Sequence, residues 1–147
     1  MTKNEIFKPL AYIIVLTMFS LGIYMTITNV KNMGTKKQVT TAGITLQKLF
    51  FECKKHWNNN STKPCNPTRQ EQLDWGLNPK IEVTIVHGRK ERFVATAKHN
   101  KTERTMQIDK ESIVYVTAND CLLKWDRNEG RHSWAPIKEL EKECKNQ

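Results

Sequence analysis

Three residues near the middle of the chain could act together as metal ligands. Cys53 and His56 are three positions apart, and Cys65 follows nine positions later. Zinc binds such thiolates and imidazoles, but a structural zinc site needs four ligands and usually draws its cysteines from closely spaced pairs. The fourth ligand and the paired spacing are both missing here. A small periplasmic protein that binds metal through these three residues is therefore only an alternative to a disulfide.

The sequence contains four cysteines, Cys53, Cys65, Cys121 and Cys144. An even number in a small domain behind a membrane anchor favours disulfides and an oxidising compartment. Three pairings are possible, and the sequence alone does not choose between them. We favour Cys53 with Cys65, which would tie a helix end to the loop that follows it, and Cys121 with Cys144, which would tie back the tail. A loop of the first size would contribute about 3 kcal/mol to stability.

The other polar residues form no catalytic set. The sequence has no Cys-x-x-Cys redox pair and no Cys-x-x-Cys-His motif for attaching haem. A Gly-x-Ser-x-Gly nucleophile motif and a glycine-rich phosphate loop are also missing. His87, His99 and His132 each lie in or beside a predicted turn, where a solvated histidine is the common case. We expect a protein that is not an enzyme, with no catalytic residue, no cofactor and no bound metal.

The charge of the chain bears on its partners. The formal net charge is +9, and the basic residues spread from Lys36 to Lys145 without a run longer than two. A nucleic-acid-binding protein normally gathers such residues on one patch beside aromatic side chains. We therefore expect no nucleic acid as a partner. An anionic membrane surface or an acidic partner subunit is a reasonable explanation of the excess.

An uncharged apolar segment near the N-terminus must position everything that follows. Pro9 to Val30 comprises 22 residues without Asp, Glu, Lys, Arg or His. As a helix this segment is long enough to cross about 30 Å of hydrocarbon. It is longer than the apolar run of a signal peptide, and no Ala-x-Ala cleavage site follows it. We expect an uncleaved transmembrane helix at residues 9–30, preceded by a polar cytoplasmic tail at residues 1–8 that is too short to fold.

The cysteines decide the orientation that we expect for this segment. Lys31, Lys36 and Lys37 after it slightly outnumber Lys3 and Lys8 before it. That count opposes the positive-inside rule. Disulfides, however, need an oxidising compartment. We therefore expect a single-pass protein of a bacterial inner membrane, with a cytoplasmic N-terminus and a periplasmic or extracellular C-terminal domain.

A second, amphipathic helical segment at residues 31–57 continues the first. Its apolar residues recur at intervals of 3, 4, 3, 4 and 4, which places them on one packing face: Val39, Ala42, Leu46, Leu49, Cys53 and Trp57. No loop signal separates the two segments, so we expect one helix of about 48 residues and about 72 Å. Gly34 and Gly43 are the positions where it could bend or fray.

The remaining residues, 58–147, predict one extracytoplasmic domain with a small antiparallel sheet. Four stretches alternate apolar and polar residues with a period of two: 81–85, 93–98, 106–109 and 113–116. Residues 67–79 and the stretch after Val116 predict irregular structure, and a short helix follows Pro136. The sheet needs a cover, and the amphipathic helix is the only long one available. We expect an α+β fold in which that helix packs on the meander.

This order of parts resembles the type IV pilins and pseudopilins. Two stretches carry the local likeness: FFECKKHW, which leads to Cys65, and RFVATAKHNKTERTMQIDKESIV, with its Phe-x-Ala-x-Ala-x-His, polar turn and Ile-Asp. The resemblance implies a pilin-like fold, whose long N-terminal helix lies half in the membrane or filament core and half on the sheet. The start of the chain differs, because a prepilin leader ends in Gly and no Gly precedes this apolar segment.

Two non-enzymatic functions are consistent with these features. The first is an anchored accessory or structural subunit of a membrane complex, in contact with lipid and, through its transmembrane helix, with other membrane subunits or copies of itself. The second is a pilin or pseudopilin that polymerises into a type IV pilus or secretion pseudopilus. The missing leader glycine favours the first. Glu5 would match the pilin assembly residue only if Met1 began the mature chain, so we expect it to be a solvated tail residue.

Overall fold

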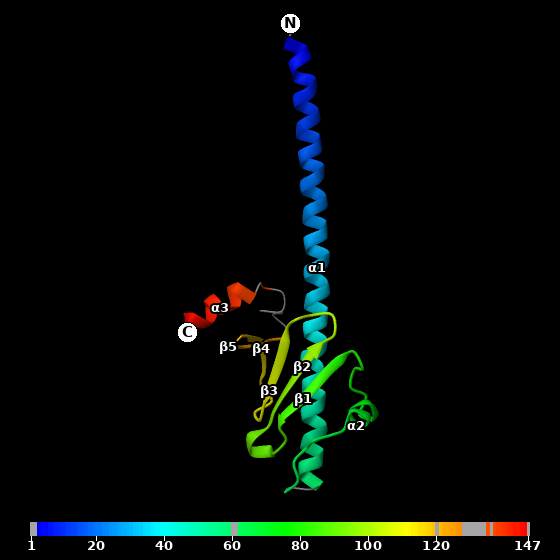
Figure 1. Ribbon diagram of the computed structural model, residues 1–147, viewed down its shortest axis with the longest axis vertical. Coiled ribbons are helices and arrows are strands. Elements are labelled where there is room, and N and C mark those ends of the chain that lie inside the picture. Colours follow the sequence, from blue (N-terminus) through cyan, green and yellow to red (C-terminus); the bar gives the residue numbers. More distant parts are fainter. Residues whose placement is uncertain (1–2, 60–61, 120, 128–134, 136, 147) are drawn as a thin grey trace. The chain divides into compact units, whose positions relative to one another are not determined.

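The computed structural model describes the chain from Lys3 to Asn146, except for residues 60–61, 120, 128–134 and 136 (Figure 1). The chain divides into two units, Met1–Gly34 and Thr35–Gln147. Helix α1 (Lys3–Asn59) contributes its first part to the first unit and its second part to the second.

Helix α1 extends further at both ends than the sequence predicted. We expected a polar tail up to Lys8 and a helix end near Trp57, whereas α1 begins at Lys3 and ends at Asn59. Once a helix is nucleated, each added residue gains a hydrogen bond, so adjacent polar residues join it readily. The expectation that residues 1–8 are too short to fold is therefore wrong for residues 3–8, which are helical, and residues 1–2 lie outside the described part. The helix also continues through Gly34 and Gly43.

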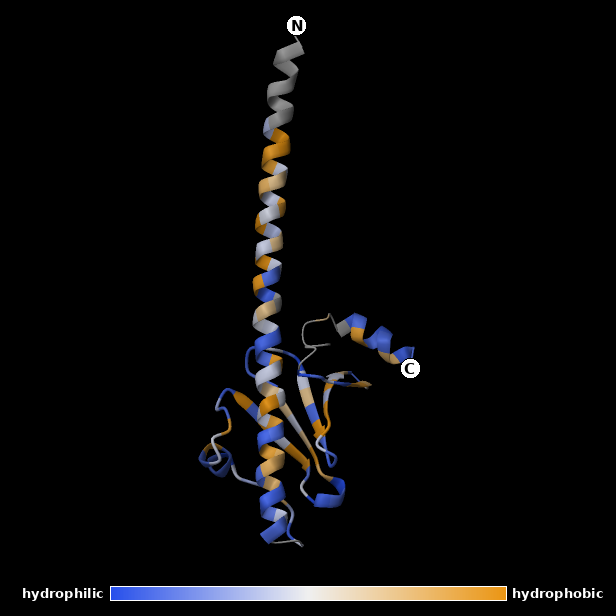
Figure 2. Cartoon of the chain, turned by 180° about the vertical axis from the view of Figure 1, so that it is seen from behind, coloured by the Kyte–Doolittle hydropathy of each residue, from blue (hydrophilic) through white to orange (hydrophobic). Residues whose placement is uncertain are grey.

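The first unit is a helix whose apolar side chains are exposed. Side chains are described here from Tyr12 onward, apart from that of Asn32. All the large apolar side chains from Tyr12 to Met33 have exposed fractions between 50% and 74%. Figure 2 shows this part of α1 largely in orange and pale colours. Among the residues that the structure describes, α1 is the one helix long and apolar enough to cross a membrane.

The second unit has a core between the second part of α1 and a five-stranded sheet. The strands are β1 (Ile81–His87), β2 (Val94–His99), β3 (Thr105–Asp109), β4 (Val114–Ala118) and β5 (Cys121–Lys124). They lie in chain order, and every neighbouring pair is antiparallel. Figures 1 and 2 show from opposite sides that α1 crosses one face of this sheet.

The predicted packing face of α1 lies in this core. All six residues are at most 3% exposed: Val39, Ala42, Leu46, Leu49, Cys53 and Trp57. A row of buried residues on the sheet faces them. Its members are paired from strand to strand: Ala97, Met106, Val116 and Leu123. Phe93, just before β2, lies 5.1 Å from the ring of Trp57 and 5.6 Å from that of Phe50, edge to face. Such aromatic pairs add to the energy of burial and fix the helix against the sheet.

Strand β5 corrects the prediction of four strands. We expected irregular structure after Val116, but Cys121–Lys124 pairs with β4 and buries Leu123. Asn119 has a φ of 54°, a left-handed conformation that Asn tolerates and that permits a tight reversal. Leu122 and Leu123 are both apolar, so this stretch does not alternate between apolar and polar residues, which is why the sequence did not show this strand.

Helix α2 (Arg69–Asp74) corrects the prediction of irregular structure at residues 67–79. The hydroxyl of Thr68 accepts a hydrogen bond from the backbone N–H of Glu71, at 3.3 Å, and the carboxylate of Glu71 accepts one from the backbone N–H of Thr68, at 2.6 Å. This reciprocal capping box satisfies two amide donors at the helix start. The pKa of Glu71 is lowered by the bond from the Thr68 backbone N–H and by a second bond that the Thr68 hydroxyl donates to the same carboxylate at 2.9 Å.

The remaining elements are short. A 3-10 turn, η1 (Lys90–Arg92), links β1 to β2. Helix α3 (Ile137–Lys145) lies where the sequence predicted a C-terminal helix, and Leu140 on it is buried. Pro136, expected at its start, lies outside the described residues.

Candidate functional site

The structure contains the two disulfides that we favoured from the sequence. Cys53 in α1 is bonded to Cys65, with their Cα atoms 5.5 Å apart, and both residues are buried. Cys121 in β5 is bonded to Cys144 in α3, with their Cα atoms 6.1 Å apart. The first bond closes the loop after α1, and the second ties α3 to the sheet. All four cysteines therefore act as crosslinks.

This bonding removes the thiolates that a metal site would need. Cys53 and Cys65 are bonded to each other, so neither sulfur is available as an anionic ligand. His56 is half-buried, and its Nε2 has no hydrogen-bond partner among the described residues. No group of three His, Cys, Asp or Glu side chains is placed to hold a metal ion in that part of the chain. In this oxidised form the three predicted ligands do not make a site.

Gly88 is the point where the end of β1, the end of α1 and the following loop meet. Its carbonyl oxygen accepts hydrogen bonds from the indole N–H of Trp57, at 3.1 Å, and from the backbone N–H of Cys65, at 2.8 Å. A Cβ atom at this position would lie 2.6 Å from the carbonyl oxygen of Cys65 and would also meet the side chain of Asn66. Only glycine permits this close approach of two backbones.

Of the three histidines named from the sequence, His99 is the one that is buried in the described part of the chain. His99 ends β2 and is 8% exposed, and its Nδ1 accepts the backbone N–H of Lys101 at 3.0 Å. Burial lowers the pKa of His99, with smaller contributions from the positive charges of Lys101 and Lys80. A neutral imidazole therefore serves as a fixed acceptor in this turn. His87 is exposed at the end of β1, and His132 lies outside the described residues.

Asp109 and Tyr115 form the best-connected polar group on the outer face of the sheet. One oxygen of Asp109 accepts the backbone N–H groups of Glu111 and Ile113, both at 2.9 Å, and the other accepts the Tyr115 hydroxyl at 2.8 Å. Burial, together with this hydrogen bond, raises the pKa of Tyr115. One oxygen of Asp109 is used in closing the β3–β4 turn and the other in binding the Tyr115 hydroxyl, so we interpret the group as structural.

Four serine and threonine hydroxyl groups of the exposed apolar helix are satisfied within the helix itself. Thr17, Ser20, Thr26 and Thr28 each donate to a backbone carbonyl three or four residues earlier, at 2.6 to 3.1 Å. Lipid chains offer no hydrogen-bonding partner, so a free hydroxyl there would carry an energetic penalty. These bonds leave the segment with a surface compatible with hydrocarbon.

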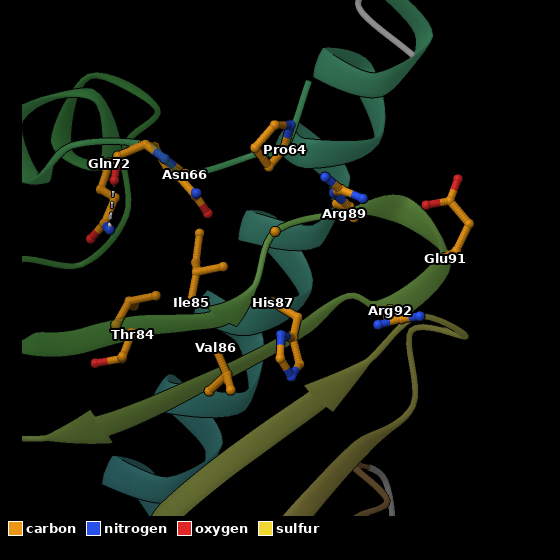
Figure 3. Close-up of a pocket in the computed structure, with 13 residues that line it drawn as sticks. Pro64, Asn66, Gln72, Thr84, Ile85, Val86, His87, Arg89, Glu91 and Arg92 are labelled. Carbon is orange, nitrogen blue, oxygen red and sulfur yellow. Dashed lines mark hydrogen bonds between the residues drawn. The ribbon is translucent and has the colours of Figure 1, made fainter. Parts of the chain in front are cut away.

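An open groove of about 850 Å³ runs along the outer edge of β1 (Figure 3). Among the described strands, β1 has only β2 as a neighbour, so its other edge is not paired with a strand in that part of the chain. The groove lies between this edge and the loop that leads into α2, and its lining includes Pro64, Asn66, Gln72, Val83 and Ile85. At the end of β1 it is lined by residues 87–89, Glu91 and Arg92.

No family model, curated protein or solved structure matches this chain. The resemblance to type IV pilins thus stays a prediction, based on the order of parts and the two local patterns. The geometry described above has to support any function by itself.

The groove is the feature that sequence reasoning did not find. The sequence did indicate the edge, because the first strand of a meander has only one neighbour along the chain and lies at a sheet edge. The segment that forms the opposite wall, including α2, had been assigned to irregular structure. A strand edge without an opposite wall does not form a groove, so the sequence did not predict one here.

Proposed function

We propose that this chain is a non-catalytic subunit of a membrane complex, anchored by one transmembrane helix at the start of α1. The observation that carries the proposal is the exposure of every large apolar side chain described from Tyr12 to Met33. In water such a surface would drive aggregation, whereas in a bilayer it needs no cover. The satisfied hydroxyl groups support the same environment.

The second unit supports a placement outside the cytoplasm. Both disulfides join parts of this unit, and such bonds persist in oxidising compartments. We therefore place the N-terminus in the cytoplasm and residues 35–147 on the periplasmic or outer side of a bacterial inner membrane. In this arrangement the transmembrane helix contacts lipid and other subunits or copies of itself.

The role of the helix as a subunit contact can be tested by exchanging its sequence. Replacing residues 12–30 with leucines would keep the hydrophobic length and remove the small and hydroxylated side chains through which membrane helices pack. After purification in a mild detergent, we expect the altered chain to remain in the membrane but to lose the subunits that accompany the natural chain. An unchanged set of bound subunits would contradict a specific contact through this helix.

A pilin or pseudopilin that forms a filament is the second candidate. It is favoured by the packing of the second part of α1 on an antiparallel sheet, which is the layout implied by the resemblance. Intact mass of the native protein separates the two candidates. The anchored subunit predicts an unprocessed N-terminus at or next to Met1, and a shortened chain with an N-methylated first residue would favour the filament.

A further inference from the structure

We propose that the groove along the free edge of β1 binds an extended acidic segment of a partner protein, which joins the sheet as an added strand antiparallel to β1. The site consists only of residues between Pro64 and Arg92. It goes beyond membrane anchoring, because it assigns a second and different contact surface to the chain. Three features support it: free backbone groups, an apolar and amide lining, and cationic side chains at one end.

The backbone of β1 has unused hydrogen-bonding groups on this side. In an antiparallel strand the N–H and C=O of a residue point to the same side, and the side alternates along the strand. The backbone N–H and C=O of Ile81 point away from β2, because the N–H donates to Asn78 and the C=O accepts from Arg69, each at 3.0 Å. The backbone N–H and C=O groups of Val83 and Ile85 therefore also point to the free edge. Among the described residues, no hydrogen bond reaches their backbone groups from that side.

The free stretch is limited at both ends. Arg69 from α2 occupies the carbonyl oxygen of Ile81, and the backbone N–H of Cys65 occupies that of Gly88. Residues 82–87 lie between these two bonds and span about 20 Å at about 3.3 Å per residue. The edge can therefore pair with a short segment of about five residues. A longer flat strand would reach the carbonyl oxygens of Ile81 and Gly88, which already accept hydrogen bonds.

The walls of the groove suit a strand with alternating side chains. Val83 and Ile85 are half-buried and present apolar surface at the edge of the core. Figure 3 shows Ile85 and Asn66 pointing toward each other across the space between β1 and the loop. A β-branched residue of the added strand can pack on the two aliphatic side chains. The exposed amide of Asn66 can bond a polar neighbour on that strand.

Charge selects an acidic occupant. Arg89 and Arg92 line the end of the groove, are exposed, and form no ion pair with any of the described residues. Of the described residues that line the groove, Glu91 alone is acidic. A second copy of the chain would bring the same arginines and another net charge of +9 to the contact, and like charges disfavour that pairing. Carboxylates beside the arginines would form charge-assisted hydrogen bonds.

Peptide binding to the full chain in phosphatidylcholine nanodiscs tests the proposal. The probe is the peptide acetyl-EETVTVTK-amide with fluorescein on the amine of its C-terminal lysine, and its N-terminal glutamates would lie beside the arginines in antiparallel pairing. We expect a saturable rise in fluorescence anisotropy. The peptide in which lysines replace the two glutamates should bind at least about tenfold more weakly.

Backbone methylation separates strand addition from simple charge attraction. Two forms of the acidic peptide carry N-methyl groups on alternate residues, one form on each of the two alternating sets. Only one set of amides can face β1. We expect one methylated peptide to lose at least about tenfold in affinity and the other to lose less than about twofold.

Substitutions in the protein locate the site. Arg89→Glu with Arg92→Glu should weaken binding of the acidic peptide about tenfold. The matched control, Lys138→Glu with Lys142→Glu, makes the same charge change on exposed positions of α3 and should alter binding less than about twofold. Val83→Pro removes an N–H that faces the free edge. It does not remove a hydrogen bond to β2, so it should abolish binding while the sheet persists.

The following results would overturn the proposal. They are no saturable binding of the acidic peptide to the natural chain, equal binding of the acidic and lysine peptides, and equal behaviour of the two methylated peptides. Equal effects of the two double substitutions would also contradict it. Circular dichroism checks the fold of each variant. If Val83→Pro unfolds the protein, the methylated peptides make the same test on the natural chain.

Discussion

Single residues fix the junction at the end of β1. The carbonyl of Gly88 holds both the indole of Trp57 and the backbone of Cys65, and the space beside it has no room for a Cβ atom. We predict that Gly88→Ala lowers the free energy of unfolding by about 1–3 kcal/mol, because the loop must move away. Urea unfolding of the full chain in detergent micelles, followed by tryptophan fluorescence, measures this loss.

The other partner in that junction is tested by Trp57→Phe. This change keeps a buried aromatic ring but removes the N–H that donates to Gly88 together with one ring of the indole, so we expect a loss of about 1–3 kcal/mol from the hydrogen bond and from the space left behind. An unchanged free energy of unfolding in Gly88→Ala would show that the close backbone approach is unimportant.

His99 predicts how stability depends on pH. Its pKa is lowered in the folded state, mainly by burial, so the unfolded chain binds a proton more readily. The stabilising effect of the neutral ring is complete above the unfolded pKa of about 6.5 and is lost as the pH falls below it. We predict a lower urea midpoint at about pH 5.5 than at about pH 7.5.

The variant His99→Asn assigns this pH dependence. Its side-chain oxygen can accept the N–H of Lys101 but does not titrate in this range. We expect the difference in midpoint between the two pH values to shrink in the variant. An undiminished difference would assign the effect to other groups.

At the scale of elements, the position of α1 on the sheet depends on a close contact at Gly43. A Cβ atom there would lie 2.8 Å from the ring of Trp125, which is 5% exposed. Alanine normally stabilises a helix by up to about 1 kcal/mol relative to glycine. We predict that Gly43→Ala nevertheless destabilises the second unit by about 1–2 kcal/mol, because the buried ring must shift.

Gly34→Ala is the matched control, since a Cβ atom at Gly34 meets nothing within 4 Å. We expect it to leave the thermal unfolding temperature unchanged or slightly raised. Equal effects of the two alanine variants would mean that Trp125 adjusts freely and that Gly43 is not required for packing.

The elements also show how much of the fold the sequence contains. The buried face of α1 follows from an apolar period that extends over several helical turns, and the first four strands follow from shorter stretches of alternating residues. Strand β5 was missed because Cys121–Lys124 has two adjacent leucines in place of an alternation and depends on the reversal at Asn119. Helix α2 was missed although Thr68 and Glu71 show a capping-box spacing, because that signal was not applied. The groove needs both the edge of β1 and the wall beside it, so tertiary placement alone reveals it.

At the scale of the whole molecule, the core and the apolar surface belong to different units. Among the residues that the structure describes, the hydrophobic core runs from Val39 to Leu140, in the second unit. We therefore predict that residues 35–147 fold without residues 1–34, as a soluble fragment with cooperative thermal unfolding and both disulfides formed. A fragment that lacks a cooperative transition in near-ultraviolet circular dichroism would show that the first unit is needed for folding.

The most direct test of membrane anchoring is flotation of the full chain with phosphatidylcholine vesicles after extraction at about pH 11. Alkaline extraction removes peripheral proteins, whereas a helix that crosses hydrocarbon stays in place because its burial is effectively irreversible. We predict that the full chain floats with the lipid and that the fragment 35–147 remains at the bottom of the gradient. Recovery of the full chain in the lipid-free fraction would contradict a transmembrane role for the start of α1.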